Sequence, residues 1–321
     1  MPRTQVRVGR ILDVRKGRYL EDAAVEIDDG LIKGVEASSE ASGRTEKGDV
    51  TIIELGSSSR LLPGLIDCHT HLMARFEESP DGYLLGLAKK SQSFRALEGA
   101  ASARGTLRAG LTTVRDVGNE GSGYADVALR DAINLGLVEG PRMQVATRGI
   151  AAVGQYLPFG VSPDLPHFPT GTQMISGAEE ARRAVREQIG HGANLIKVYA
   201  DWGEKPTLTP KELRTVVEEA HKLGRRVASH AGTPVGIENA INAGVDSIEH
   251  GDRVSRELLE MMRSKGVFLV PTTGAVERAI EKRRGKSNVS PEEKRHFDDF
   301  LSQGRRDTAG FEPRSKDSVR V

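Results

Sequence analysis

Residues 61–71 read LLPGLIDCHTH, an apolar run that ends in two histidines separated by one residue. Side chains alternate between the two faces of a strand, so a strand here would place Asp67, His69 and His71 on one face and Cys68 on the other. Two imidazoles at the end of a strand can bind a divalent cation such as zinc. This stretch therefore predicts a strand that ends either in part of a metal site or in two ordinary histidines of a turn, and the rest of the chain must decide between them. Cys68 is predicted to be a small buried side chain and not a nucleophile.

After this stretch, apolar runs alternate with amphipathic helical patterns, which is typical of parallel strand–helix–strand units. Six further strands are predicted, at 111–118, 141–149, 193–201, 225–232, 245–251 and 266–272. Helices are predicted at 91–109, 124–137, 178–191, 209–223, 235–243 and 255–265, and a long loop at 150–176. A chain of 321 residues can contain one (β/α) barrel of about 250 residues.

The N-terminal part has a different pattern of short alternating strands, at 6–14, 23–27, 31–35 and 50–55. Asp29 and Gly30 lie between the second and third of these and predict a tight hairpin turn. This is too little β structure to close a core alone, so it should pack on other strands. Residues 1–60 are therefore predicted to form part of a small β-sandwich, and residues 61–303 to form the barrel.

Composition excludes several classes of partner. The chain has 46 basic and 45 acidic residues, a net charge of +1, which provides no field to attract nucleic acid or an anionic membrane. A single cysteine excludes an internal disulfide and fits a reducing cytoplasm. No segment has the pattern of a signal peptide or a membrane span. We expect a cytoplasmic protein with a small-molecule substrate.

Four histidines and a lysine lie on four of the predicted barrel strands. These residues are His69, His71, Lys197, His230 and His250. Barrel enzymes carry their chemistry at the C-terminal ends of the strands, which makes these positions candidate ligands. Lys197 alternates with Leu195 and Tyr199 and should face the barrel interior, where an ammonium group without a partner would be costly.

As a set, these motifs resemble those of the amidohydrolase superfamily, and within it the prolidase-like and imidazolonepropionase-like amide hydrolases. The matching stretches are PGLIDCHTH (63–71), GLTTVRDVG (110–118), GANLIKVYAD (192–201), VASHAG (227–232) and GVDSIEHGD (244–252). The resemblance implies a TIM-like barrel with two divalent cations, usually zinc. His69 and His71 would bind one ion, His230 and His250 the other, and carbamylated Lys197 would bridge them.

The implied activity is hydrolysis of carbon–nitrogen bonds in dipeptides, N-acyl amino acids or cyclic amides, by attack of a metal-activated hydroxide on the carbonyl. A carbamate is in effect a long carboxylate, whereas an ammonium group cannot bind a cation, which explains the lysine. Arg148, Tyr156 and Tyr199 are the candidate substrate-binding residues. A lactonase or phosphotriesterase activity, which would use the same pair of metal ions, is the alternative within this chemistry.

The sequence departs from the family pattern near its end. The family has an aspartate after an apolar eighth strand, but residues 304–321 are polar, and neither Asp307 nor Asp317 follows such a strand. The expectation is an incomplete barrel, truncated or frame-shifted, with a disordered tail at 304–321 and no assigned catalytic acid/base. A catalytically impaired chain is thus the competing hypothesis. The unpaired edges of the first and last barrel strands could pair with another copy of the chain, so a homo-oligomer is also possible.

Overall fold

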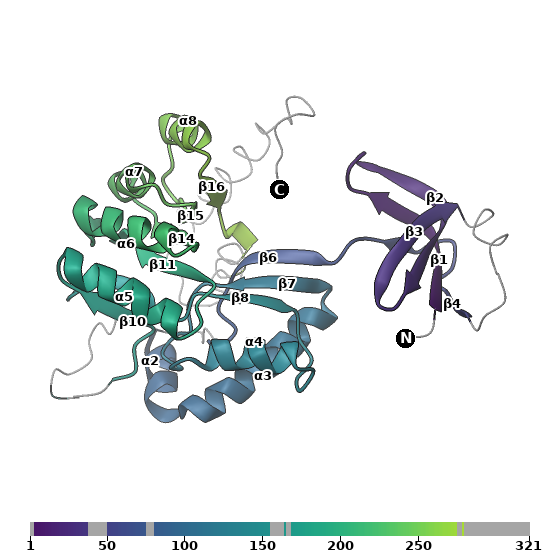
Figure 1. Ribbon diagram of the computed structural model, residues 1–321, viewed down its shortest axis with the longest axis horizontal. Helices are drawn as coiled ribbons and strands as arrows, with labels where there is room; N and C mark the ends of the chain where they lie inside the picture. Colours follow the sequence, from purple (N-terminus) through teal and green to yellow (C-terminus); the bar gives the residue numbers. More distant parts are fainter. Residues whose placement is uncertain are drawn as a thin grey trace, which may run out of the picture. The chain divides into compact units, whose positions relative to one another are not determined.

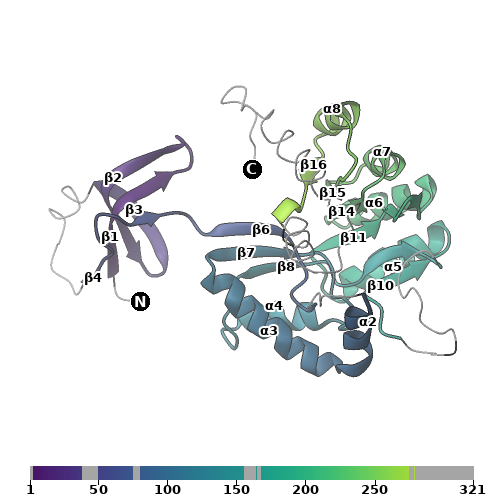
Figure 2. The ribbon, with the colours of Figure 1, turned by 180° about the vertical axis from the view of Figure 1, so that it is seen from behind.

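The computed structural model describes residues 3–37, 50–74, 80–154, 164, 168–274 and 278 (Figures 1 and 2). The chain forms two compact units, one of residues 1–66 and 110–113 and the other of residues 67–109 and 114–321. None of the helices in the described ranges is long and apolar enough to cross a membrane. Tyr156 and the tail at 304–321, with Asp307 and Asp317, lie outside the described residues.

The first unit is built on one five-stranded sheet. Asp29 and Gly30, between its second and third strands, have φ angles of 50° and 73°, as a two-residue type I′ hairpin turn requires. The predicted strands and hairpin are confirmed, whereas the β-sandwich stays a prediction. The strands are β1 (Arg3–Asp13), β2 (Arg18–Asp28), β3 (Leu31–Ala37), β4 (Val50–Glu54) and β5 (Arg60–Leu61), in the order β3-β2-β1-β4 with β5 also paired to β1.

The larger sheet associated with the second unit has six strands, and all of its pairs are parallel. Its order is β10 (Thr172–Ile175), β9 (Gly149–Ala152), β11 (Leu195–Tyr199), β14 (Arg226–Ala231), β15 (Ser247–His250) and β16 (Phe268–Val270). A three-stranded sheet contains β6 (Leu65–Thr70), β7 (Leu111–Asp116) and β8 (Arg142–Val145). A short hairpin, β12 (Asp201–Trp202) and β13 (Lys205–Pro206), follows β11.

Helices alternate with these strands, and α5 to α8 lie along one side of the six-stranded sheet (Figures 1 and 2). The helix α6 shows why the sequence folds this way locally. Thr209 and Glu212 form a reciprocal capping box at its start, and Pro210 occupies the first turn, where no amide donor is needed. The helices are α2 (Pro80–Lys89), α3 (Gln92–Arg108), α4 (Ala125–Asn134), α5 (Ala178–Gly190), α6 (Pro210–Lys222), α7 (Pro234–Ala243) and α8 (Arg256–Lys265).

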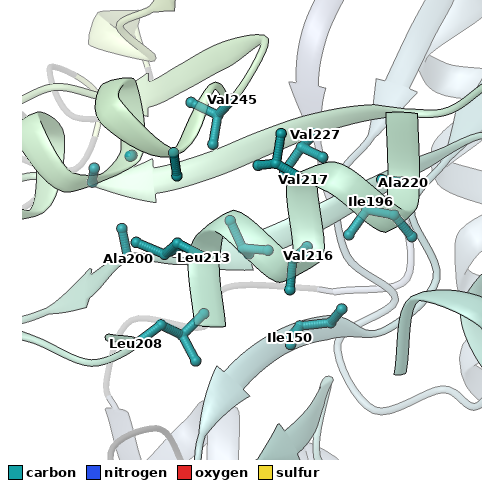
Figure 3. Packing of buried hydrophobic residues seen from close by; sticks show 14 of the residues in the cluster. Ile150, Ile196, Ala200, Leu208, Leu213, Val216, Val217, Ala220, Val227 and Val245 are labelled. Atoms are coloured by element: carbon teal, nitrogen blue, oxygen red, sulfur yellow. The ribbon is translucent and has the colours of Figure 1, made fainter. Parts of the chain in front are cut away.

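The main core lies between this sheet and its helices (Figure 3). Leu213, Val216, Val217 and Ala220 recur at helical spacing, so α6 presents one buried apolar face. They pack with strand residues such as Ile196. Each fully buried aliphatic side chain of this kind contributes about 1.5–3 kcal/mol of transfer free energy, so the core holds the strands that carry the candidate ligands.

Most predicted strands and helices of this unit are confirmed within one or two residues, but the strand predicted at 141–149 is wrong. The chain forms β8 and β9 in two different sheets, with a break at residues 146–148. Thr147 has a φ of 60° there. Its amide donates to Asp126 and its hydroxyl donates to Gln188. The loop predicted at 150–176 likewise contains most of β9 and all of β10.

One helix start depends on a glycine. Asp201 accepts hydrogen bonds from the amide and hydroxyl of Thr233, the N-cap of α7, at 2.7 and 2.6 Å. A Cβ added to Gly236 would overlap the carboxylate of Asp201. We expect Gly236→Ala to lower the free energy of unfolding by about 1–3 kcal/mol because of this overpacking. In Gly105→Ala the added Cβ within α3 meets open space, so this control should gain about 0.5–1 kcal/mol in chemical denaturation.

Candidate metal centre

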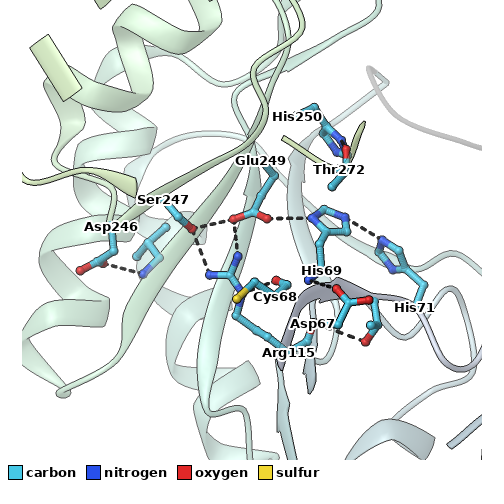
Figure 4. Close-up of polar contacts among 12 residues, drawn as sticks. Asp67, Cys68, His69, His71, Arg115, Asp246, Ser247, Glu249, His250 and Thr272 are labelled. Carbon is cyan, nitrogen blue, oxygen red and sulfur yellow. Dashed lines mark hydrogen bonds and ion pairs between the residues drawn. The ribbon is translucent and has the colours of Figure 1, made fainter. Parts of the chain in front are cut away.

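The four candidate histidines lie together in the second unit. His69 is on β6, His71 directly follows it, His230 is on β14 and His250 ends β15. The ring centroids of His69 and His71 are 5.1 Å apart, those of His69 and His250 are 4.8 Å apart, and those of His230 and His250 are 4.6 Å apart. Three separate segments thus contribute to one continuous cluster of four imidazoles. Figure 4 shows His69, His71 and His250.

The Nε2 atoms of His69 and His71 face each other at 3.2 Å. The Nδ1 atom of His69 is bonded to Glu249 at 2.7 Å, and that of His71 lies 3.1 Å from the carbonyl oxygen of Gly118 and 3.0 Å from Glu120. These partners assign the Nδ1 protons, so two Nε2 lone pairs converge. Only a proton or another cation between them makes this approach favourable. Two ligands of a tetrahedral zinc are about 3.3 Å apart.

The two imidazoles differ in how readily they take a proton. Burial lowers the pKa of His69 to about 4. Burial also opposes protonation of His71, but the charge and hydrogen bond of Glu120 outweigh it and raise the pKa of His71 above its usual value. In the metal-free chain, protonated His71 can therefore donate through Nε2–H to His69. A cation that binds here must displace that proton.

His230 and His250 form the other half of the cluster. Burial lowers the pKa of His250 to about 3 and holds that of His230 well below its usual range, with further lowering by the charge of Lys197. Both rings are therefore neutral at pH 7 and keep one lone pair. The Nδ1 atom of His250 is 2.8 Å from the hydroxyl of Thr272. The ring of His230 packs against those of Tyr199 and Trp202, with centroids at 5.5 and 5.1 Å, and these two rings also contact each other at 5.8 Å.

Lys197 is in β11 and only 1 % of its surface is exposed. Its ammonium nitrogen lies 5.5 Å from the ring centroid of Tyr199. Burial lowers the pKa of Lys197 to about 8, against the opposing charge of Glu249. A substantial fraction of the amine is thus neutral near physiological pH. When Lys197 is protonated, its positive charge lowers the pKa values of His69, His230 and His250.

The buried acid Glu249 was missed by the sequence analysis, whereas Asp116 was expected to lie at the end of the second barrel strand, on the same side as the cluster. Glu249, fully buried in β15, accepts from His69. Burial alone would raise its pKa, but the bond to His69 and the charges of Lys197 and Arg115 lower it to about 2. Burial raises the pKa of Asp116 to about 7. The available signal was a carboxylate inside a predicted barrel strand, directly before a candidate histidine, as in SIEH at 247–250.

Of the candidate substrate residues that the structure describes, Tyr199 lies against His230 and Lys197 in the cluster, whereas Arg148 is bonded to a neighbouring strand. Arg148 is half-buried and donates to the carbonyl of Thr172 at 2.6 Å. Tyr199 is buried beside Ala151. Cys68 was predicted to be buried, and this is wrong, since its side chain is exposed. It lies on a face of β6 that the described residues leave open to solvent.

Across the part of the chain that the structure describes, no three His, Cys, Asp or Glu side chains are arranged to hold one metal ion among themselves. The imidazoles instead form two pairs, His69 with His71 and His230 with His250. A metal ion bound by one pair would need at least one further ligand that is not an imidazole. Lys197 is buried, and its charge acts on His69, His230 and His250. Imidazole donors, two of which have their Nδ1 atoms bonded to acceptors, fit zinc and similar cations.

Known proteins carry related sequences and folds. A sequence model of the amidohydrolase family matches residues 60–321. Ochratoxinase from Aspergillus niger is 34% identical over 242 residues, which cover 68% of this chain and 48% of the relative. The chain therefore spans about half the length of the curated relatives it matches.

Solved structures of related enzymes have similar folds. A Xaa-Pro dipeptidase with methionine bound in its active site has a TM-score of 0.79 and 29% identity, covering 96% of this chain and 75% of that chain. The structure of ochratoxinase from A. niger has a TM-score of 0.73 and 28% identity, covering 94% and 71%. With a family match that spans most of the sequence, this chain belongs to the amidohydrolase family.

Proposed function

We propose that the chain is a metal-dependent hydrolase of amide bonds in small molecules, with dipeptides and N-acyl amino acids as the first substrate classes. The observation that carries the proposal is the pair of Nε2 atoms of His69 and His71, 3.2 Å apart with both Nδ1 atoms engaged. Family membership supports hydrolysis, and the relatives include a Xaa-Pro dipeptidase and an ochratoxinase. The TIM-like barrel and the N-terminal β-sandwich are part of the same proposal.

His69 and His71 would hold one divalent cation and His230 and His250 a second, with zinc as the expected metal. When bound, such cations make water a nucleophile at neutral pH and polarise the carbonyl group of the substrate. Lys197 would join the two positions as a carbamate. Its neutral amine adds to carbon dioxide and releases one proton, and the pKa of about 8 makes the neutral amine accessible.

The test is metal analysis together with a hydrolysis panel on the zinc-loaded chain. The panel contains Xaa-Pro dipeptides, N-acyl amino acids, a cyclic amide, a lactone and a phosphotriester. Two zinc ions per chain and turnover of an amide support the proposal. Turnover of only the lactone or phosphotriester overturns the amide specificity. Two zinc ions without any turnover identify the catalytically impaired chain, for which loss of an acid/base alone predicts a rate lower by ~10²–10⁴-fold.

Arg148 is the candidate for binding a substrate carboxylate. A charged hydrogen bond is worth about 1.5–3 kcal/mol, so Arg148→Ala should raise KM for an N-acyl amino acid by roughly 10–100-fold with little change in kcat. Tyr199→Phe is the parallel variant for the other candidate. The control substrate is the matching N-acyl amine without a carboxylate, whose KM should be insensitive to Arg148→Ala. Equal effects on both substrates would exclude carboxylate binding by Arg148.

A further inference from the structure

We propose that Glu249 and Arg115 are a positioning pair that fixes the ring orientation and tautomer of His69 and so prepares its Nε2 atom for a cation. The inference rests on the proposed metal site but concerns a different property of it. Neither Glu249 nor Arg115 would bind the cation directly; both would act through His69. The circuit that they form is drawn in Figure 4.

Both oxygens of Glu249 are engaged, and each has a distinct role. Oε2 accepts from Nδ1 of His69 at 2.7 Å. Oε1 accepts from Nη2 of Arg115 at 2.7 Å and from the hydroxyl of Ser247 at 2.6 Å. The side chain of Glu249 is fully buried, so its charge requires these donors. With two donors directed at Oε1, only Oε2 is left to face the imidazole.

Arg115 is held in three places by its planar guanidinium group. Nε donates to the backbone carbonyl of Cys68 at 2.6 Å, Nη1 to the hydroxyl of Ser247 at 3.1 Å, and Nη2 to Glu249. Cys68 directly precedes His69, so the circuit returns to the backbone of the histidine that it orients. A lysine cannot reproduce this fork, because its ammonium is a single point of charge.

The circuit also joins the two sheets. His69 and Cys68 are on β6 and Arg115 is on β7, in the three-stranded sheet, whereas Glu249 is on β15 in the six-stranded sheet. The orientation of the His69 ring therefore depends on β15, the strand that carries Glu249 and ends in His250. His250 itself is held differently, since its Nδ1 atom faces the neutral hydroxyl of Thr272 and not a carboxylate.

Glu249→Gln tests the pair with a sharp expectation. The two donors from Arg115 and Ser247 will hold the amide oxygen of the substituted side chain, which leaves its amide NH₂ facing Nδ1 of His69. The imidazole must then accept at Nδ1 and carry its proton on Nε2, which blocks the ligand atom. We expect ¹⁵N NMR of the metal-free variant to show this tautomer, and zinc affinity in chelator competition to fall roughly 10–100-fold.

Glu219→Gln is the matched control. Glu219 is also a buried carboxylate paired with an arginine, 2.7 Å from Nε of Arg186, but it has no contact with the cluster in the described network. It should leave the His69 tautomer and the zinc affinity unchanged. An unchanged tautomer and an affinity within about twofold of the parent in Glu249→Gln would overturn the proposal, because second-layer partners of this kind are worth roughly 10–100-fold.

Arg115→Lys keeps the test decisive if Glu249→Gln does not fold, as checked by circular dichroism. It should weaken zinc binding and broaden the His69 signals, whereas an unchanged spectrum and affinity would overturn the pair. If the parent chain binds no zinc, the proposed function fails. The tautomer of metal-free His69 still reports on the positioning pair in that case, so the two failures are distinguishable.

Discussion

Lys197→Met is expected to abolish amide hydrolysis while making the metal-free protein more stable. If the proposed function holds, the activity should fall by roughly 10³-fold or more, because the variant lacks the lysine that would hold the cations as a carbamate, and metal ions contribute several kcal/mol to lowering the barrier. Lys197 is fully buried, and replacing buried charges by apolar groups of similar volume is often stabilising by about 1–4 kcal/mol. Glu249 keeps Arg115 as its partner in this variant. Stopped assays and urea denaturation measure the two effects.

The pH dependence of stability separates this explanation from a general packing effect. Burial lowers the pKa of Lys197 in the folded chain from 10.5 to about 8. Between pH 8 and 10.5 the unfolded chain therefore binds one proton more at this site than the native chain does. The free energy of unfolding of the metal-free parent should rise with pH in this window, by up to about 1.4 kcal/mol per pH unit from this group.

In Lys197→Met that component must vanish, so the difference between the stability curves of parent and variant should shrink as the pH rises from 8 to 10.5. A constant difference across the window would mean that the amine is not the cause of the stability change. Hydrolysis retained at the parental rate would instead remove Lys197 from the site.

The sequence predicted those features that depend on local periodicity and on strand ends. His69, His71, His230 and His250 each close or follow an apolar run, so the alternation of strands and helices brought their segments to one cluster. The interior position of Lys197 followed from its place between Leu195 and Tyr199. Both predictions follow from the alternation of strands and helices along the chain, without knowing which strands are neighbours in the sheet.

What the sequence could not predict depends on contacts across the two sheets. Arg115 and Glu249 are 134 positions apart, and neither lies in a motif that requires the other. The break at Thr147 was missed for a related reason. Its positive φ is held by Asp126 and Gln188, from helices on either side of the break, and β-branched residues do not favour that conformation. Tertiary partners overrode local propensity there.

Zinc loading is expected to raise the thermal unfolding midpoint of the metal-free chain substantially. A ligand that binds only the native state at about 1,000 times its Kd stabilises it by ~4 kcal/mol. For domains of 150–250 residues each kcal/mol shifts the midpoint by about 2–4 °C, so the shift should be roughly 8–16 °C. Differential scanning fluorimetry with excess zinc and with a chelator measures it.

Proton release gives the second signature of the same event. The pKa of His71 is raised, so its Nε2 atom can carry a proton toward His69 in the metal-free chain, and that proton must leave when a cation binds between the two Nε2 atoms. Zinc affinity should therefore increase as the pH rises through the pKa of His71. Calorimetric titration in buffers of different ionisation enthalpy counts the protons. The double variant His69→Ala/His71→Ala should lose this proton release and most of the thermal shift. If the double variant keeps both, zinc binds elsewhere, because no other pair in the described cluster shares a proton in this way.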